Sequence, residues 1–188
     1  MMKMNLRSCC LCVWNFIDPI YYRFTRLEYI VNEKGNQTMV RVRLTKYKGR
    51  SITLADGTVI NKNDTLLKIH LHNVQLVKQV HMFESELRRG LVIYKSVRDA
   101  LPSIAKYIQL HENTDDIKGI IGITSLYKGC KRLGFETKPI HSNYYKFFKK
   151  AAFYPIDFIA SATNSKNQKT PVYLFMPKDQ LYRKYKPV

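Results

Sequence analysis

Apolar and polar residues alternate with a period of two from Met39 onward. The apolar positions are Val40, Val42 and Leu44, and the polar positions between them are Arg41, Arg43 and Thr45. A period of two is typical of a β-strand that buries one face and exposes the other. We therefore predict a strand whose solvent-exposed face is strongly positive.

Short strands and turns follow this first strand. The predicted strands are residues 51–55, 58–60 and 65–72. Asp56-Gly57 joins the first two, because this dipeptide readily adopts the positive φ angles of a tight hairpin turn. Residues 61–64 form the next turn. The pattern thus predicts an N-terminal β-hairpin region.

Apolar spacing changes to three and four residues between positions 74 and 110, which indicates helix. We expect two helices, or one long broken helix, with Gly90 at the joint. Pro102 is expected to kink the second segment or to restart it, because proline cannot donate the helical backbone hydrogen bond.

The second half of the chain predicts more strands and helices. An apolar run at 117–124 is a buried strand, 125–132 is a helix stopped by Gly134, and 135–140 is a strand, which makes a strand-helix-strand unit. After a helix at 143–154, strands at 156–161 and 172–176 form a last hairpin, and 178–185 is a terminal helix. These elements predict a single α+β domain over residues 1–188, with a mixed sheet flanked by helices.

Residues 1–29 are predicted to form an aromatic, amphipathic helical segment that is broken at Asp18-Pro19. Its aromatic side chains either pack on the core or, through residues 8–24, contact a membrane surface. The apolar run 9–17 is about half of the ~20 residues needed to cross a bilayer, so no transmembrane helix is expected. No small-residue cleavage site follows, so no signal peptide is expected. We expect a cytoplasmic protein, peripheral to the membrane if this segment binds lipid.

Net charge narrows the range of partners that the protein could bind. The 188-residue chain carries 32 Lys and Arg against 14 Asp and Glu, a formal charge of +18. Such a field attracts an anionic partner, which can be a glycan, a membrane surface or nucleic acid. Hydrophobic residues make up 45% of the chain, enough for a folded core. Cys9, Cys10 and Cys12 are crowded near the start and Cys130 stands alone, which argues against a secreted disulfide scaffold.

The densest cluster of basic residues is expected to bind this anionic partner. It comprises Arg41, Arg43, Lys46, Lys48 and Arg50, with Tyr47 among them and no acidic residue between Thr38 and Ala55. Basic residues interleaved with an aromatic suit a surface that follows a nucleic-acid backbone and stacks a base. The alternative is a solvated strand whose charges discourage edge-to-edge pairing.

Two histidines at the end of the predicted strand 65–72 could share a metal ion. His70 and His72 would face the same side of the sheet, because they are two residues apart. A third ligand would have to come from Asp56, Asp64, His81 or His111, none of which has a diagnostic spacing. The alternative is that both are sheet histidines bonded to their neighbours, and no metal or other cofactor is expected.

No segment completes a catalytic motif, so we favour a protein that is not an enzyme. The candidates for a site are His72, Asn73, Asp56, Asp64 and Thr124. In such a site His72 and Asn73 would supply hydrogen bonding or proton transfer at a strand end. These side chains form one site only if the fold brings them to one pocket.

An acyltransferase is an alternative function. Residues 126–136, LYKGCKRLGFE, resemble the late helix-to-strand junction of GNAT acyltransferases. The family's pyrophosphate-binding loop has no counterpart, because the segment Gly119 to Gly122 lacks the leading Arg or Gln and the closing small residue. Cys130 is interpreted as a core residue rather than a nucleophile, since no His or Asp has a readable relation to it.

Three segments taken together resemble the YkoP-like family of spore-forming Gram-positive bacteria over nearly the whole chain. They are WNFIDPIYYRFTRLEYI, DGTVINKNDTLLKIHLHN and GIIGITSLYKGCKRLGF. The most specific positions are Asp56-Gly57-Thr58, Asn63-Asp64, Leu71-His72-Asn73, Gly122-x-Thr124 and Leu133-Gly134-Phe135. Asn63 stands where the family has glycine, and asparagine also tolerates a left-handed turn.

The resemblance implies an accessory role. Related domains are associated with polysaccharide deacetylases, which suggests a binding protein linked to cell-envelope or sporulation glycan metabolism. A polysaccharide deacetylase is then the expected protein partner. The alternatives are the GNAT-like acyltransferase and a nucleic-acid-binding protein.

Overall fold

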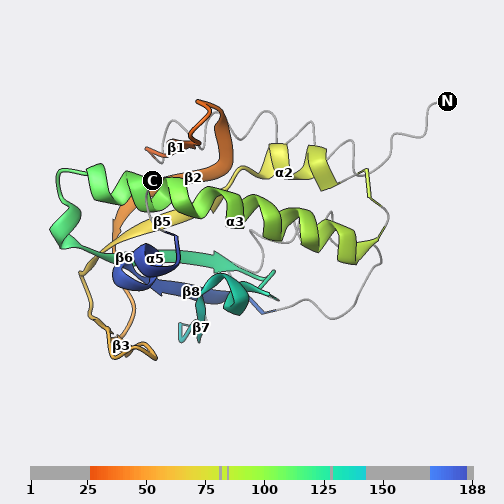
Figure 1. Ribbon diagram of the computed structural model, residues 1–188. Coiled ribbons are helices and arrows are strands. Elements are labelled where there is room, and N and C mark those ends of the chain that lie inside the picture. Colours follow the sequence, from red (N-terminus) through yellow and green to blue (C-terminus); the bar gives the residue numbers. More distant parts are fainter. Residues whose placement is uncertain (1–25, 81, 84, 128, 143–169, 186–188) are drawn as a thin grey trace.

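The computed structural model describes residues 26–80, 82–83, 85–127, 129–142 and 170–185. Its strands are β1 (Glu28–Val31), β2 (Gln37–Lys46), β3 (Ile52–Thr53), β4 (Val59–Ile60), β5 (Thr65–Leu71), β6 (Ile117–Thr124), β7 (Glu136–Pro139) and β8 (Val172–Pro177). Its helices are α2 (Asn73–Val80), α3 (Glu86–Leu110) and α5 (Lys178–Lys184), with the short 3-10 helices η1 (Thr114–Asp116) and η2 (Cys130–Leu133). These elements confirm the α+β fold class (Figure 1).

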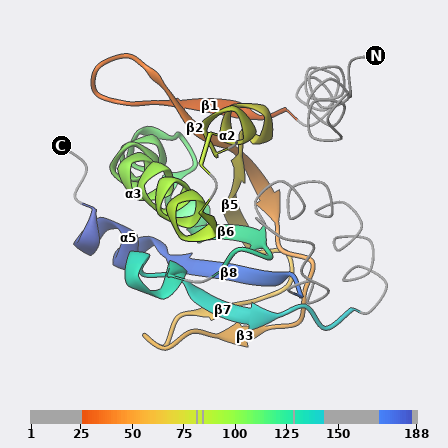
Figure 2. The same ribbon diagram turned by 90° about the vertical axis from the view of Figure 1, so that its right-hand side faces the viewer.

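A six-stranded mixed sheet is the centre of the fold, in the order β1-β2-β5-β6-β8-β7 (Figure 2). β5 and β6 are parallel, and the other neighbours are antiparallel. Because parallel strands cannot be joined by a tight turn, the chain passes through α2 and α3 between β5 and β6.

The register of β2 on β5 decides which side chains share a face of the sheet. Arg41 is paired with His70, and Val42 with Ile69. Successive side chains of a strand point to opposite faces. The outer face therefore carries Arg41, Arg43, Lys68 and His70, and the core face carries Val40, Val42, Leu67 and Ile69.

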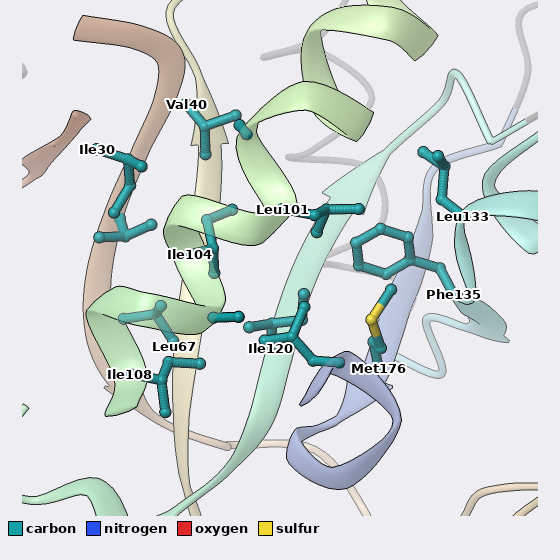
Figure 3. Close-up of a cluster of buried hydrophobic side chains, with 14 of the residues drawn as sticks. Ile30, Val40, Leu67, Leu101, Ile104, Ile108, Ile120, Leu133, Phe135 and Met176 are labelled. Atoms are coloured by element: carbon teal, nitrogen blue, oxygen red, sulfur yellow. The ribbon is translucent and has the colours of Figure 1, made fainter. Parts of the chain in front are cut away.

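The core face is covered by α3 and α5 (Figure 3). Leu101, Ile104 and Ile108 are fully buried, and their spacing of three and four residues places them on one side of α3. They belong to one cluster with Leu67 of β5 and Ile120 of β6. Burying each such side chain stabilises the fold by about 1.5–3 kcal/mol, so this layer holds the parallel strands together.

The hairpin β3–β4 is a separate two-stranded sheet that packs on part of the outer face. Leu54 and Ile60 from the hairpin region cluster with Leu66, Ile121 and Phe175 of the large sheet. The large sheet is thus covered by helices on one side and partly by the hairpin on the other.

Both predicted turns of this region are confirmed. Gly57 has φ +88°, and the Asp56 carboxylate accepts a hydrogen bond from the Thr58 N–H at 3.0 Å. Asn63 has φ +72°, so asparagine adopts the left-handed conformation that the sequence predicted for it.

The helical region differs from the prediction at its joint. The break between α2 and α3 lies at residues 81–85, whereas Gly90 lies inside α3. Ser85 begins α3 as its N-cap and accepts a hydrogen bond from the Arg88 N–H at 3.5 Å. Ser is a preferred N-cap residue, and this signal outweighs the modest helix penalty of one glycine. Pro102 lies inside the continuous α3 and does not restart it.

The prediction of a helix at 125–132 was wrong. Only Cys130–Leu133 is helical, as η2, and Gly134 ends it with φ +99° as predicted. The Thr124 hydroxyl oxygen accepts a hydrogen bond from the Leu126 N–H at 2.9 Å, and Gly129 has φ +86°. A local side-chain bond and a left-handed glycine both divert the backbone from an α-helix.

The strand at 117–124 is confirmed at both of its ends. The predicted strand 172–176 corresponds to β8, which is hydrogen-bonded to β6 on one edge and to β7 on the other. Residues 156–161, the helix at 143–154 and the N-terminal segment up to residue 25 lie outside the described residues. Residues 28–29, predicted to end that segment, belong to β1.

Within the described ranges, none of the helices combines the length and the apolar character that a bilayer crossing requires.

Two glycines of β6 provide a test of this packing. A Cβ on Gly119 would meet the Met176 carbonyl oxygen and lie 3.0 Å from the Pro177 Cα, whereas a Cβ on Gly122 would lie 3.4 Å from the flexible end of Ile69. We predict that Gly119→Ala lowers the free energy of unfolding by about 3 kcal/mol, because backbone cannot move aside.

Gly122→Ala serves as the control and should cost less than about 1 kcal/mol. Urea unfolding followed by circular dichroism measures both variants. Equal stability of the two variants would contradict the described β6–β8 packing.

Candidate functional site

Four lysines and one carboxylate lie where β2 ends and β5 and β6 begin. Lys46, Lys48, Lys62 and Lys118 are exposed to solvent, and the carboxylate is that of Asp64. We call these four lysines the turn patch, after the Asn61–Asp64 turn at its centre. Two of them, Lys46 and Lys48, belong to the basic cluster that the sequence singled out.

Tyr47 anchors the turn patch. Its N–H donates to the Asp64 carbonyl oxygen at 2.9 Å, and its own carbonyl oxygen accepts from the Asn63 N–H at 2.7 Å. Its side chain is 5% exposed and its ring meets the Phe175 ring edge-on, with centroids 5.6 Å apart. Since neighbouring residues of an extended chain point to opposite sides, burying Tyr47 leaves Lys46 and Lys48 in solvent.

The predicted role of Tyr47 in stacking a base was wrong for this reason. Burial raises the pKa of its hydroxyl. The ring also lies so close to Gly49 that a Cβ at that position would meet the Tyr47 hydroxyl. The aromatic side chain among the basic residues is thus part of the hydrophobic cluster beneath the hairpin.

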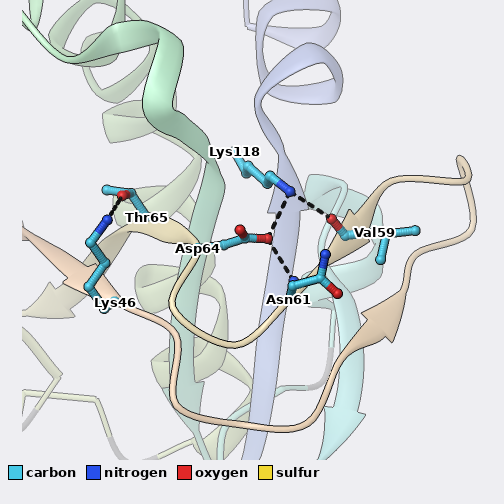
Figure 4. Close-up of polar contacts among 6 residues, drawn as sticks. All are labelled: Lys46, Val59, Asn61, Asp64, Thr65 and Lys118. Atoms are coloured by element: carbon cyan, nitrogen blue, oxygen red, sulfur yellow. Dashed lines mark hydrogen bonds and ion pairs between the residues drawn. The ribbon is translucent and has the colours of Figure 1, made fainter.

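Hydrogen bonds hold the turn patch in place (Figure 4). The Lys46 Nζ donates to the Thr65 Oγ1 at 2.6 Å, and the Lys48 Nζ donates to the Asn63 Oδ1 at 3.2 Å. The Lys118 Nζ lies 2.8 Å from the Asp64 Oδ2 and donates to the Val59 carbonyl oxygen at 3.3 Å.

Asp64 is part of the turn rather than a reactive group. Its Oδ2 accepts a hydrogen bond from the Asn61 N–H at 2.6 Å. Burial alone would raise the pKa of the Asp64 carboxyl, but the hydrogen bonds from Lys118 and Asn61 and the charges of Lys118 and Lys46 outweigh it. The pKa therefore lies below its ordinary value, and Asp64 is ionised at neutral pH.

Arg41 and Arg43 do not form the solvent-exposed positive face that the alternation predicted. Arg41 is 2% exposed, and Arg43 is half-buried. The Arg41 guanidinium lies over the Tyr29 ring at 4.8 Å from its centroid and donates to the Tyr29 hydroxyl at 2.8 Å. A long basic side chain can thus belong to a polar interior, and the period of two does not distinguish that case from an exposed face. Arg50 is exposed, as expected.

Two other candidate residues, His72 and Asn73, lie at the opposite end of β5. His72 follows β5 directly, is 8% exposed and caps α2, because its Nδ1 accepts from the Gln75 N–H at 3.5 Å. Its ring lies 6.0 Å from that of Tyr29. Asn73 is the first residue of α2.

Thr124 is the last residue of β6, and His72 follows the last residue of β5. The pairing of β5 with β6 runs from Thr65 and Ile117 to Lys68 and Ile121, so it stops four residues before His72. Ser125, which follows β6, is 4% exposed and is a buried polar residue like Arg41 and His72. His72 and Asn73 are adjacent in the chain, and the described strand pairing places neither Thr124 nor Ser125 beside them.

Asp56 and Asp64 are not grouped with His72 and Asn73 either. Asp64 and His72 are separated by eight residues of strand, about 26 Å at ~3.3 Å per residue. Asp56 lies in the turn of the β3–β4 hairpin, with an exposed side chain. In the described ranges no three His, Cys, Asp or Glu side chains are grouped as a metal site would require, around His70 and His72 or elsewhere.

The glycines and the cysteine that were compared with acyltransferase features have structural roles. Gly119 and Gly122 lie inside β6, where they allow close packing on β8 and β5. Cys130 packs against the main core, and burial raises the pKa of its thiol to about 11. A thiol of that pKa is protonated at neutral pH and is a poor nucleophile.

Sequence reasoning missed Lys62, Lys118 and Ser125. Lys118 is the one charged residue in the apolar run 117–124, and that position marks where β6 meets solvent. Lys62 lies in a turn that was predicted, between two asparagines. Ser125 carries no local signal, because the burial of a polar side chain depends on tertiary packing.

Comparison with known proteins identifies relatives along nearly the whole chain. The YkoP domain model matches residues 7–185. A protein of Bacillus subtilis (strain 168), described as uncharacterized protein YkoP, is 42% identical over 181 residues, which cover 96% of this chain and 98% of that protein. No solved structure matches the chain.

The depressed pKa of Asp64 predicts a pH-dependent contribution to stability. Because the folded-state pKa lies below the ordinary 3.8, the carboxylate stabilises the fold above that pH and loses its effect as the pH falls below it. We expect Asp64→Asn to cost about 1 kcal/mol at pH 7 and progressively less as the pH falls below 3.8.

Chemical denaturation of both proteins from pH 3 to pH 7 measures this difference. Glu112→Gln removes an exposed carboxylate elsewhere and controls for net charge. A cost for Asp64→Asn that does not depend on pH would refute the ion pair with Lys118.

The raised pKa of Cys130 predicts slow alkylation. A pKa of about 11 instead of 9.0 lowers the thiolate fraction at pH 8 by about 100-fold. We expect iodoacetamide to modify Cys130 about 100-fold more slowly in the folded protein than in urea, as measured by peptide mass spectrometry. Comparable rates in both states would show that this thiol is reactive.

Proposed function

The chain belongs to the YkoP domain family, and from this premise we propose that it is a non-catalytic binding protein that serves cell-envelope or sporulation glycan metabolism. Its turn patch holds an anionic glycan. One observation carries the proposal, namely four solvent-exposed lysines at one end of the sheet, three of which, Lys46, Lys48 and Lys118, are held by hydrogen bonds.

Electrostatics supports an anionic partner. The turn patch has an excess of three positive charges over Asp64, within a chain of net charge +18. Such a field raises the local concentration of a polyanion and its rate of association. Lys46 and Lys48 are already oriented by bonds to Thr65 and Asn63, so less side-chain entropy is lost when an anion binds.

A glycan agrees better with this surface than nucleic acid does. Single-stranded nucleic acid is bound by basic residues together with aromatic rings that stack on bases. Tyr47, the aromatic of this segment, is buried in the hairpin cluster. The turn patch therefore offers charge and hydrogen bonding without a stacking platform.

A non-catalytic role is supported by the placement of the candidate residues. Asp64 lies at the end of the sheet opposite His72, Asp56 lies in the exposed turn of the β3–β4 hairpin, and the Cys130 thiol is protonated. The related domains associated with polysaccharide deacetylases suggest that the enzymatic partner is such a deacetylase. In that arrangement this protein holds the anionic polymer while the partner acts on it.

Calorimetric titration with polygalacturonate, an anionic polysaccharide, tests the proposal, with dextran as the neutral probe. We expect binding to polygalacturonate at low salt and its loss at 1 M salt, where charge interactions are screened within about 3 Å. The variant Lys46→Gln/Lys48→Gln/Lys62→Gln should bind at least about tenfold more weakly.

A charge-matched control is Lys34→Gln/Lys106→Gln/Lys131→Gln, which removes three exposed lysines elsewhere. Equal weakening by both variants, or no binding by the unmodified protein, would overturn the proposal. Tighter binding to single- or double-stranded DNA than to polygalacturonate would favour the nucleic-acid alternative. A thermal shift with acetyl-coenzyme A would favour the acyltransferase.

A further inference from the structure

Three large apolar side chains are exposed close together at the junction of α2 and α3. Met82 is 72% exposed, Leu87 is 74% exposed and Leu91 is 49% exposed. Exposed apolar residues that occur singly need no explanation, but a group of them marks an interaction surface. These three residues span ten positions of a chain whose other apolar side chains are largely buried.

Cations lie on the same face of α3 as the two leucines. Leu87, Leu91, Lys95 and Arg98 succeed one another at intervals of four, four and three residues, so their side chains lie along one face of the helix. Arg88 is exposed next to Leu87. Asp99 is the acidic residue with a described side chain near this face, and Arg98 pairs with it at 2.9 Å. Among the described side chains, the face therefore combines apolar tips with the cations Arg88 and Lys95, and the sequence adds Glu84 and Glu86 at its edge.

The loop that presents Met82 is held by a buried arginine. Arg89 is 3% exposed and its Nε donates to the Phe83 carbonyl oxygen at 2.6 Å. The Phe83 N–H in turn donates to the Val80 carbonyl oxygen at 3.1 Å, at the end of α2. Phe83 is thus bonded to both α2 and α3, whereas the side chain of Met82 beside it lies in solvent.

We propose that this surface, which comprises Met82, Leu87, Leu91, Arg88 and Lys95, docks the protein on a membrane that contains anionic lipids. A surface of protruding apolar side chains flanked by cations suits a bilayer interface, where apolar side chains enter the acyl boundary and cations meet the phosphates. The +18 charge of the chain adds attraction over the distance of about one Debye length.

Docking here leaves the turn patch accessible. The surface begins beyond the end of β5, where α2 and α3 meet, whereas the turn patch lies at the start of β5 (Figure 1). The protein can therefore contact a lipid surface with one end and an anionic polymer with the other. The membrane proposal does not depend on the glycan proposal, since the two use different residues.

Co-sedimentation of the full chain with vesicles tests the inference. We expect binding to vesicles of equal parts phosphatidylglycerol and phosphatidylcholine, and much weaker binding to pure phosphatidylcholine. The variant Met82→Gln/Leu87→Gln/Leu91→Gln should lower the partition coefficient at least about tenfold, because three apolar side chains no longer enter the bilayer. Arg88→Gln/Lys95→Gln should lower it about tenfold at low salt and little at high salt.

The matched control is Val31→Gln/Val59→Gln/Leu110→Gln, which replaces three apolar side chains that are 49%, 44% and 76% exposed elsewhere. It should bind vesicles within about twofold of the unmodified protein. No vesicle binding by the unmodified protein, or equal loss in both apolar variants, would overturn the inference. Sedimentation velocity adds a second criterion. If the protein forms a dimer that only Met82→Gln/Leu87→Gln/Leu91→Gln dissociates, and if that variant binds vesicles as the unmodified protein does, the surface would belong to an interface with a second copy of the chain instead.

Discussion

The parallel pairing of β5 and β6 is the constraint on which the rest of the structure depends. Parallel neighbours require a crossover, and here the chain returns through α2 and the 25-residue α3. The crossover is stable because α3 buries Leu101, Ile104 and Ile108 against Leu67 and Ile120 of the two strands. The same burial decides which face of the sheet is excluded from solvent, and therefore which side chains remain available for binding or catalysis.

Parallel strands also divide the molecule into two chemically different ends. β5 and β6 start together, and their starts carry Asp64 and Lys118 in an exposed lysine patch. At their other ends, β5 is followed by His72 and β6 by Ser125, both buried. An exposed charged surface can bind a polyanion, whereas buried polar groups mainly order their neighbourhood. The turn patch is for that reason the better supported binding surface.

Features that depend on a few adjacent residues could be predicted from the sequence. The Asp56-Gly57 turn and the left-handed Asn63 follow from local backbone preference, and the strand 117–124 follows from its apolar run. The helix joint was misplaced because Gly90 is tolerated within a well-packed helix, and the helix at 125–132 failed because Thr124 and Gly129 redirect the backbone. Each error arose where a contact competed with a propensity.

The sequence by itself determined the α+β class, the turns at Asp56-Gly57 and Asn61–Asp64 and the excess of positive charge, because these follow from periodicity, local preference and composition. The family was indicated by the resemblance of three segments to its members. Only the tertiary structure decided which basic residues meet solvent. Arg41 and Lys46 belong to the same strand, yet Arg41 is buried over Tyr29 and Lys46 is exposed beside Thr65. The exposure of a side chain depends on what other segments pack against it, and an alternating pattern in one strand does not contain that information.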